Sequence, residues 1–131
     1  LHDAKGELTT GVSRDAVRVT LGSQNDRQPH RTDRRIDQLW NEELAAAAAS
    51  GKQLFNGSKF RLRGIRLTDG GEGGSVHIQL GLTGYRDYIG TQRRPEAERE
   101  ALEADGEADL ADPRAHLSNA LGCEALLLTS D

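Results

Sequence analysis

The sequence is short of apolar and aromatic side chains, and it contains no methionine. Hydrophobic residues make up 35% of the 131 residues, aromatic residues make up 4%, and 15 residues are glycine. The mean hydropathy is -0.66. A chain of this length has room for one domain with a modest core. Because it begins with Leu1 and lacks methionine, we expect a fragment rather than a processed or trimmed product.

Cysteines, membrane-spanning runs and signal segments are also scarce or missing from the sequence. The single cysteine, Cys123, excludes an intrachain disulfide and fits a reducing compartment. No apolar run is long enough to span a bilayer, and residues 1–20 lack the apolar core of a signal peptide. We therefore predict a cytoplasmic protein that does not act at a membrane.

Acidic residues outnumber basic ones, but unevenly along the chain. The net charge is -4, with 12 Lys and Arg against 8 Asp and Glu in residues 1–66, and 5 against 13 in residues 67–131. A nucleic-acid-binding domain would combine a strongly basic surface with interleaved aromatic side chains. Neither half has this combination, so we predict no nucleic-acid partner.

The two ends of the chain predict a loose segment and two short strands. Residues 1–15 are polar and contain glycine, which favours a loose N-terminal segment. Residues 16–22 alternate between apolar and other side chains, which predicts a strand with Val17, Val19 and Leu21 on one side. Residues 123–129 form an apolar run that meets turn residues and then stops. We expect a strand there that needs a return strand as its partner.

Two helices are predicted from periodicity and end signals. The first covers about residues 34–50, with Asp33 as its N-cap. The second covers about residues 95–105, with Pro95 near its first turn and Gly106 as its stop.

A glycine-rich loop between two alternating segments predicts an antiparallel hairpin of strands at about 59–68 and 75–83. A bulge at Gly64 would place all the apolar residues of the first strand on one inward side. These residues are Phe60, Leu62, Ile65 and Leu67. The residues expected to point outward, as a solvated face, are Lys59, Arg61, Arg63 and Arg66. Together the elements predict an α+β fold with short antiparallel strands.

Polar residues that directly follow the second hairpin strand are candidates for binding a ligand. Arg86 would pair with a phosphate, Tyr85 would stack on a uracil or a sugar, and Asp87 lies beside them. A structural role is the alternative, in which Arg86 and Asp87 fix the local chain shape and the tyrosines seal the edge of the core. Adjacent residues project in different directions, which favours the structural role.

Several motifs occur together in an order that resembles a known family. The runs "LFNGSKFRLRG" and "LGLTGYRDYIGT" are preceded by "IDQLWNEEL" and followed by "LSNALGCEALLLTSD". In this order they are similar to the N-terminal region of Nudix hydrolases that cleave UDP-glucose and related UDP-sugars. The resemblance covers residues 16–131. It implies that residues 16–122 are a lobe preceding the Nudix α/β/α sandwich, and that residues 123–131 are the first, truncated strand of the Nudix domain.

The same resemblance implies a chemistry. Such enzymes depend on Mg²⁺ and split the diphosphate of a UDP-glucose-type substrate into UMP and a sugar 1-phosphate. Their glutamates lie in a box of the form Gly-x5-Glu-x7-Arg-Glu-U-x-Glu-Glu-x-Gly-U, where U is apolar, and carboxylate oxygens are the ligands that Mg²⁺ prefers.

The sequence "REALEADGE" is a partial match to the end of that box. The matching residues are Arg99, Glu100, Glu103 and Gly106. The departures are Tyr85 for the first Gly, Thr91 for the upstream Glu, Ala104 for the second Glu of the pair and Glu107 for the final apolar residue. We interpret the match as a solvated helix face, and we predict no catalytic residue and no metal ligand in this chain.

Three functional hypotheses follow. The first is a fragment of a Nudix UDP-sugar hydrolase that is inactive by itself. The second is a non-catalytic module that binds nucleotide sugars. The third is a protein-interaction module that recruits another chain by strand addition. The sequence leaves the preferred UDP-sugar and the oligomeric state open.

We predict marginal stability for the 131-residue chain. Burial of its few large apolar side chains, at roughly 25 cal/mol per Å², barely offsets the chain entropy lost on folding. A thermal scan by circular dichroism should show a broad transition or none. A sharp transition at high temperature would contradict this and favour a stand-alone module.

Overall fold

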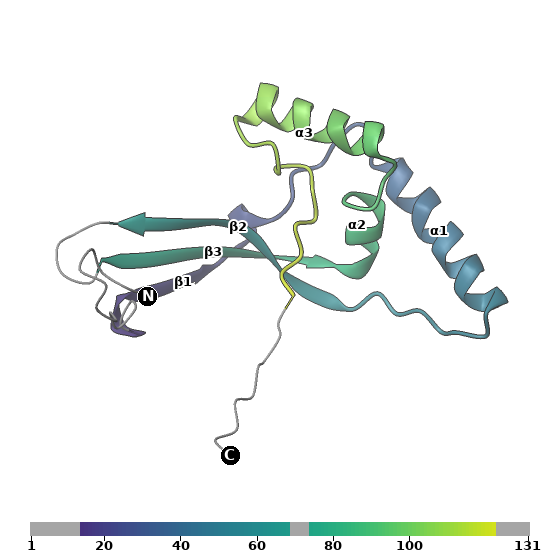
Figure 1. The fold of residues 1–131 in the computed structure, drawn as a ribbon, viewed down its shortest axis with the longest axis horizontal. Helices are drawn as coiled ribbons and strands as arrows, with labels where there is room; N and C mark the ends of the chain where they lie inside the picture. The colour runs from purple at the N-terminus through teal and green to yellow at the C-terminus, as the bar shows by residue number, and fades with distance from the viewer. Residues whose placement is uncertain (1–13, 69–73, 123–131) are drawn as a thin grey trace, which may run out of the picture.

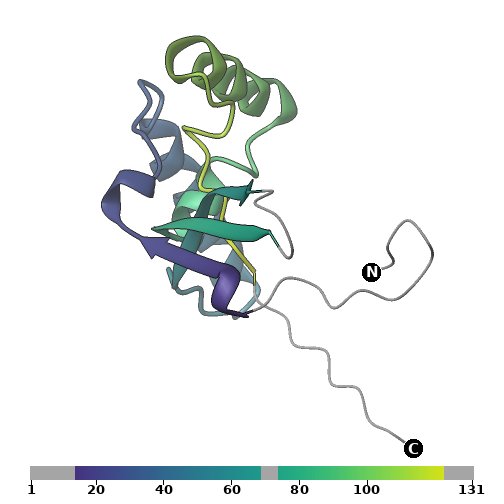
Figure 2. The ribbon, with the colours of Figure 1, turned by 90° about the vertical axis from the view of Figure 1, so that its left-hand side faces the viewer.

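The fold is α+β, as the sequence predicts. A computed structural model describes residues 14–68 and 74–122. The elements are η1 (Arg14–Ala16), β1 (Val17–Leu21), η2 (Ser23–Asn25), α1 (Arg34–Ala49), β2 (Ser58–Thr68), β3 (Ser75–Gly84), α2 (Tyr85–Gly90) and α3 (Glu96–Leu110). Figure 1 shows the far ends of β2 and β3 extending away from the helices, and Figure 2 shows α3 above the strands. No helix within the described ranges is long and apolar enough to cross a membrane.

The three strands form one sheet in the order β1-β3-β2. β2 and β3 pair antiparallel, which confirms the predicted hairpin. β1 pairs with β3 in parallel, so the prediction of antiparallel strands throughout is wrong for β1. The reason lies in connectivity: α1 and β2 separate β1 from β3 along the chain, so β1 can reach the free edge of β3 in the same direction as β3. The strand predicted at residues 123–129 lies outside the described residues.

The bulge predicted in β2 is present, but the face that it creates is not buried. The register with β3 shifts between Leu62 and Gly64, so the four apolar residues of β2 lie on one side of the sheet, as predicted. The prediction that this side is the core is wrong. Leu67 is 73% exposed, Ile65 is 56% exposed and Phe60 is 49% exposed.

The core lies instead among the helices and the polar side of the sheet. Its apolar members are Ile36, Ile89, Leu102, Ala115 and Leu117, while Leu80 of β3 is buried on the apolar side of the sheet. Close packing of α1 on α2 depends on Gly90, because a Cβ built there would lie 2.6 Å from the Cγ2 atom of Ile36. The core is therefore small, with one apolar side chain from each of the three helices and two from the segment after α3.

Arg61 is the largest departure from the outward-facing row predicted for β2. Lys59, Arg63 and Arg66 are exposed as predicted, but Arg61 is only 2% exposed. The chain segments that cover the polar face of the sheet leave their carbonyl groups pointing at the Arg61 guanidinium. Burial lowers the pKa of Arg61 from its ordinary value.

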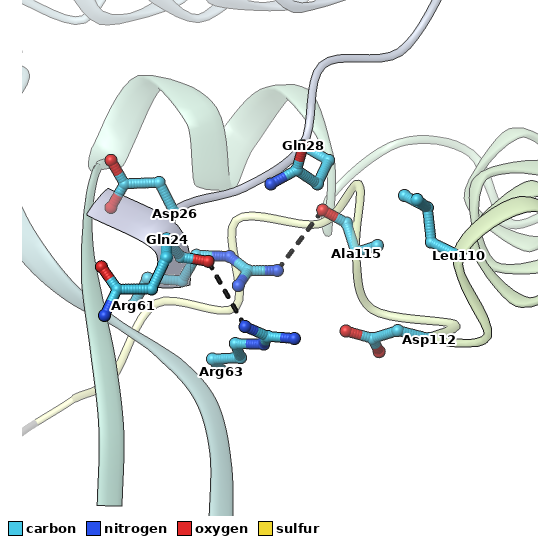
Figure 3. Close-up of a pocket in the computed structure, with 8 residues that line it drawn as sticks. All are labelled: Gln24, Asp26, Gln28, Arg61, Arg63, Leu110, Asp112 and Ala115. Atoms are coloured by element: carbon cyan, nitrogen blue, oxygen red, sulfur yellow. Dashed lines mark hydrogen bonds between the residues drawn. The ribbon is translucent and has the colours of Figure 1, made fainter. Parts of the chain in front are cut away.

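The Arg61 guanidinium donates hydrogen bonds to carbonyl oxygens of two distant segments. Its Nη1 donates to Asn25 at 2.9 Å and its Nε donates to Leu117 at 3.1 Å. Its Nη2 donates to Arg114 at 2.6 Å, with Ala115 at 3.5 Å. Figure 3 shows the guanidinium directed at the segment that carries Ala115, beside a hollow of about 210 Å³. Arg61 thus fastens residues 25 and 114–117 to the sheet.

The ends of two helices differ from the predicted end signals. α1 begins at Arg34 as expected, but the Asp33 side chain does not cap it and pairs with Arg27 at 2.6 Å instead. α3 continues through Gly106 to Leu110 and ends at Ala111, which has a φ of 52° in the left-handed region. A Cβ at Gly106 would collide with the Asp112 carbonyl oxygen, so this glycine permits the chain to fold back rather than stopping the helix.

The last described residues add a short antiparallel pairing to the outer edge of β2. Arg61 forms a bridge with Ala120. Leu62 donates its backbone N–H to the Asn119 carbonyl at 3.0 Å, and Leu121 donates to Phe60 at 2.8 Å. β2 is therefore paired on both sides near its start.

We expect Arg61→Met to lower the free energy of unfolding by about 3 kcal/mol, because several buried carbonyl oxygens lose their donor. The matched control is Arg63→Met, which removes an exposed arginine from the same strand and should change it by less than about 0.5 kcal/mol. Urea unfolding followed by Trp40 fluorescence measures both. Equal effects of the two substitutions would show that Arg61 does not hold the loops.

Candidate functional site

The predicted candidates Tyr85, Arg86 and Asp87 form the first turn of α2, rather than the loop expected from the sequence. β3 leads directly into this helix. The Tyr85 N–H donates to the Gly57 carbonyl at 3.1 Å, and the Arg86 N–H donates to Asn56 Oδ1 at 2.9 Å. The residues before β2 therefore accept hydrogen bonds from two of the free backbone donors at the start of α2.

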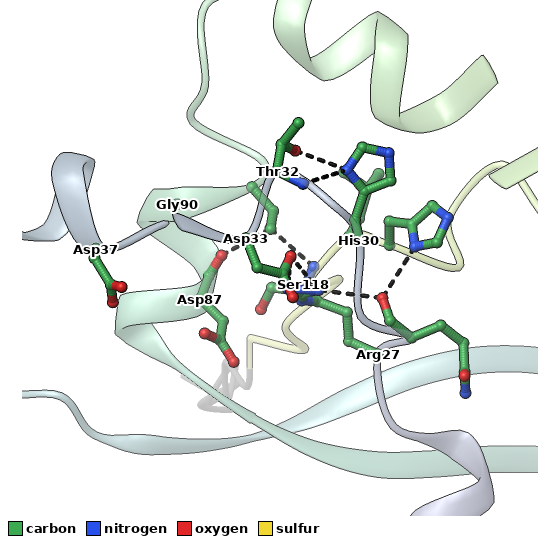
Figure 4. Close-up of polar contacts among 12 residues, drawn as sticks. Arg27, His30, Thr32, Asp33, Asp37, Asp87, Gly90 and Ser118 are labelled. Atoms are coloured by element: carbon green, nitrogen blue, oxygen red, sulfur yellow. Dashed lines mark hydrogen bonds and ion pairs between the residues drawn. The ribbon is translucent and has the colours of Figure 1, made fainter. Parts of the chain in front are cut away.

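Arg86 and Asp87 line an open hollow between the starts of α1 and α2. The hollow has a volume of about 530 Å³. Its lining residues are Arg27, Arg31, Asp33, Arg34, Ile36, Asp37, Arg86 and Asp87. Figure 4 shows three carboxylates in this region: Asp33 from the chain before α1, Asp37 from α1 and Asp87 from α2. Arginines and carboxylates thus meet here from three parts of the chain.

The guanidinium of Arg86 is already balanced by carboxylates. It forms an ion pair with Asp37 of α1 and lies 3.5 Å from Asp87 Oδ1. Arg27 is paired with Asp33 in the same way. A phosphate would have to compete with these carboxylates for the arginines, which is possible because the Arg86 and Asp37 side chains are 33% and 59% exposed.

Tyr85 does not line the hollow. Its ring lies 6.2 Å from that of Tyr88 in a stacked arrangement and 6.1 Å from that of Trp40 in an edge arrangement. These spacings are typical of aromatic side chains that pack between helices. Tyr85 and Arg86 therefore project in different directions, and a role for Tyr85, Arg86 and Asp87 in substrate binding stays a prediction.

Polar residues behind α2 form a largely buried cluster, here called the buried latch, that hydropathy does not predict from the sequence. Its members are Thr91, Gln92, Ser118 and Asn119. The Thr91 hydroxyl donates to the Asp87 carbonyl at 2.7 Å and accepts the Ser118 N–H at 2.9 Å. Gln92 Oε1 accepts the Asn119 N–H at 3.0 Å. Because all these groups are polar, only the fold reveals that Thr91 and Ser118 are fully buried.

Arg94 is the second buried arginine, and it fixes the end of α2 to the chain before α1. Its Nε donates to the Gly90 carbonyl at 2.6 Å, and its two Nη groups donate to the Thr32 hydroxyl at 2.8 Å and the Thr32 carbonyl at 3.3 Å. Burial lowers the pKa of Arg94. Like Arg61, it binds carbonyl oxygens rather than carboxylates.

Two histidines that are far apart in the sequence meet beside α3. The rings of His30 and His116 lie 4.7 Å apart, edge to face. His30 Nε2 is 2.7 Å from Asp105 Oδ2, and His116 Nδ1 donates to the Gln28 carbonyl at 3.0 Å. Within the described ranges, no group of three or more His, Cys, Asp or Glu side chains is arranged to hold a metal ion.

Comparison with known proteins identifies relatives of this chain. No protein-family model matches it. It is 34% identical over 122 residues to uridine diphosphate glucose pyrophosphatase NUDT22 of Mus musculus, which covers 92% of the chain and 38% of the relative. The bovine protein of the same name is 35% identical over 123 residues, or 92% of the chain and 40% of the relative. Nudix hydrolase 9 of Arabidopsis thaliana is 30% identical over 131 residues, or 93% and 39%.

The chain is thus similar to part of a protein named as a Nudix hydrolase and to part of UDP-glucose pyrophosphatases. The resemblance predicted from its motifs is thereby confirmed. The chain spans about two fifths of the length of the curated proteins that it matches. The domain boundaries at residues 16, 122 and 123 stay predictions.

The partial Nudix box of this chain, at residues 99–107, is an ordinary stretch of α3. Arg99 pairs with Glu103 at 3.6 Å, one turn apart, and Glu100 is exposed. Thr91, at the position of the upstream glutamate, is part of the buried latch. The residues in these positions do not fit the magnesium site of a Nudix hydrolase, because hydroxyl and methyl groups replace two carboxylates.

We expect Asp105 to stabilise the fold above its unfolded pKa and to lose that effect in acid. The hydrogen bond from His30, followed by the charge of Arg31, holds the pKa of the Asp105 carboxyl below its ordinary value. A depressed pKa adds stability above about pH 4, and this is lost as the pH falls through the folded value.

Asp105→Asn should therefore be less stable than the parent chain near pH 5, with a difference in urea midpoint that shrinks toward about pH 3. Asp109→Asn, an exposed position in the same helix, is the control. A difference that stays constant across this range would contradict the expectation.

Proposed function

We propose that this chain is the N-terminal lobe of a Mg²⁺-dependent Nudix hydrolase that cleaves UDP-sugars to UMP and sugar 1-phosphate. The observation that carries the proposal is the identity of about a third, over 92% of the chain, to three mammalian proteins named UDP-glucose pyrophosphatase. A nucleotide sugar of the UDP-glucose type is the proposed substrate, and a cytoplasmic location is part of the proposal.

In this proposal the lobe contributes substrate contacts rather than the metal site. Mg²⁺ would neutralise the diphosphate and assist the attack of water, but its carboxylate ligands would come from a complete Nudix box outside these 131 residues. The hollow beside α2 supports a role in substrate binding, since four arginines line it. A diphosphate displacing Asp37 from Arg86 would gain a charged hydrogen-bond donor.

Incubated alone with UDP-glucose and Mg²⁺, the 131-residue chain should release no UMP. Joined to the remaining part of the mouse relative, in place of the region that it matches, it should release UMP and glucose 1-phosphate when Mg²⁺ is present. Glu103→Gln in the joined protein should leave the rate within about twofold, because the partial box is not used. Chromatography of the nucleotide products measures all three.

Two outcomes would contradict the proposal. UMP release by the chain alone, abolished by Glu103→Gln, would place catalysis within these residues. Calorimetric binding of UDP-glucose without turnover in the joined protein would favour the alternative of a non-catalytic nucleotide-sugar-binding module.

A further inference from the structure

One side of the sheet is apolar across all three strands, and we call it the apolar face. Register pairs Val19 of β1 and Ile65 of β2 with Ile78 of β3, and the neighbouring pairs follow the same alternation. The residues of the apolar face are Val17, Val19, Leu21, Phe60, Leu62, Ile65, Leu67, Val76, Ile78, Leu80 and Leu82. No charged or polar side chain interrupts it at these paired positions.

Most of the apolar face is open to solvent. Seven of its members have exposed fractions between 39% and 73%: Val17, Val19, Leu21, Phe60, Ile65, Leu67 and Leu82. Single exposed apolar residues are common on protein surfaces, but a contiguous patch contributed by three strands marks an interaction surface.

The chain covers the opposite side of the sheet instead. η2 lies against Gly81, where a Cβ would meet the Asn25 carbonyl, and Arg61 holds residues 114–117 over the same side. The loops of this chain therefore pack on the polar side of the sheet, and the apolar side is left for another binding partner.

The length of the relatives indicates what could cover the apolar face. The matched region is 38% to 40% of each relative, so more than half of each relative lies outside the region that this chain matches. Leu121, which is 42% exposed and pairs with Phe60, lies at the border of the apolar face. The described residues end one position later, at Gly122.

We propose that the apolar face is the docking surface for the catalytic portion of a Nudix hydrolase of the relatives' kind. The proposal rests on the proposed function, since it takes the occupant to be the part of such an enzyme that this chain does not span. Apolar area removed from water supplies the driving force. The arginines that line the hollow beside α2 are not part of the apolar face.

The test compares one substitution in two settings. Leu67→Lys places a charge on the apolar face, and Phe55→Lys places the same charge in the loop before β2, at a residue with nearly equal exposure of 70% against 73%. In the 131-residue chain alone both should leave the unfolding midpoint in urea nearly unchanged. In the chain joined to the remaining part of the mouse relative, Leu67→Lys should lower the melting temperature by about 5 °C or more, while Phe55→Lys should not.

Leu67→Met, which keeps the apolar character, should retain the melting temperature of the joined protein. If the joined protein does not fold, the 131-residue chain is titrated with the separately produced remaining part of the relative. Binding by the parent chain and by Phe55→Lys, but not by Leu67→Lys, then supports docking, and absence of binding by all three overturns it.

Two further results would overturn the proposal. One is a loss of stability from Leu67→Lys that is no larger in the joined protein than in the chain alone. The other is a dimer of the chain alone in sedimentation that Leu67→Lys dissociates, which would assign the face to a second copy. UDP-glucose hydrolysis by the joined protein reports the proposed function separately. A joined protein that is active but not destabilised by Leu67→Lys would contradict only the docking proposal. A joined protein that is inactive but destabilised by Leu67→Lys would contradict only the proposed function.

Discussion

The hydrogen bonds of the Arg61 guanidinium decide which side of the sheet this lobe covers. They gather carbonyl oxygens from Asn25 and from residues 114–117, which are nearly ninety positions apart in the chain. A buried carbonyl left without a donor costs about 1–3 kcal/mol, and the apolar core is too small to outweigh several such losses. The polar side of the sheet is therefore the side that the loops cover, and the apolar side is left to solvent.

Buried polar side chains also bind backbone groups of several segments around α2. Arg94 binds the carbonyls of Gly90 and Thr32, and the Thr91 hydroxyl binds both Asp87 and Ser118. Arginine stays protonated even when burial lowers its pKa, so each buried guanidinium needs several acceptors and joins several segments. The start of α2, with Arg86 and Asp87, is thereby held in place by backbone contacts. A substrate contact of useful precision requires support of this kind.

Local patterns in the sequence predict the elements well, because they depend on neighbouring residues. The helix at 34–49, the hairpin and the bulge at Gly64 follow from periodicity and glycine placement. Alternation also predicts correctly which apolar residues share a face. It cannot predict whether that face is covered, because cover depends on segments distant in the chain.

Most of the features that the sequence did not predict depend on contacts between distant segments. Arg61 has the same sequence setting as Arg63, and only the position of the loops distinguishes them. β1 lies parallel to β3 because a helix and a strand intervene. α2 has six residues, which is too short for a helical period to be seen. Tyr85 and Arg86 were recognisable as candidates, but their partners Trp40 and Asp37 lie on another helix.

If the proposed docking holds, an apolar face open to water links the folding of this chain to the assembly of an enzyme. Whatever binds the folded lobe, and not the unfolded chain, adds its binding free energy to the stability of the fold. A lobe with few buried apolar side chains then needs no high stability of its own. Since β3 forms part of the apolar face and runs without a break into α2, a partner docked on the sheet is placed at a set position relative to the arginine-lined hollow. Under the proposed function, a chain whose Nudix box is incomplete thereby takes part in positioning a nucleotide sugar.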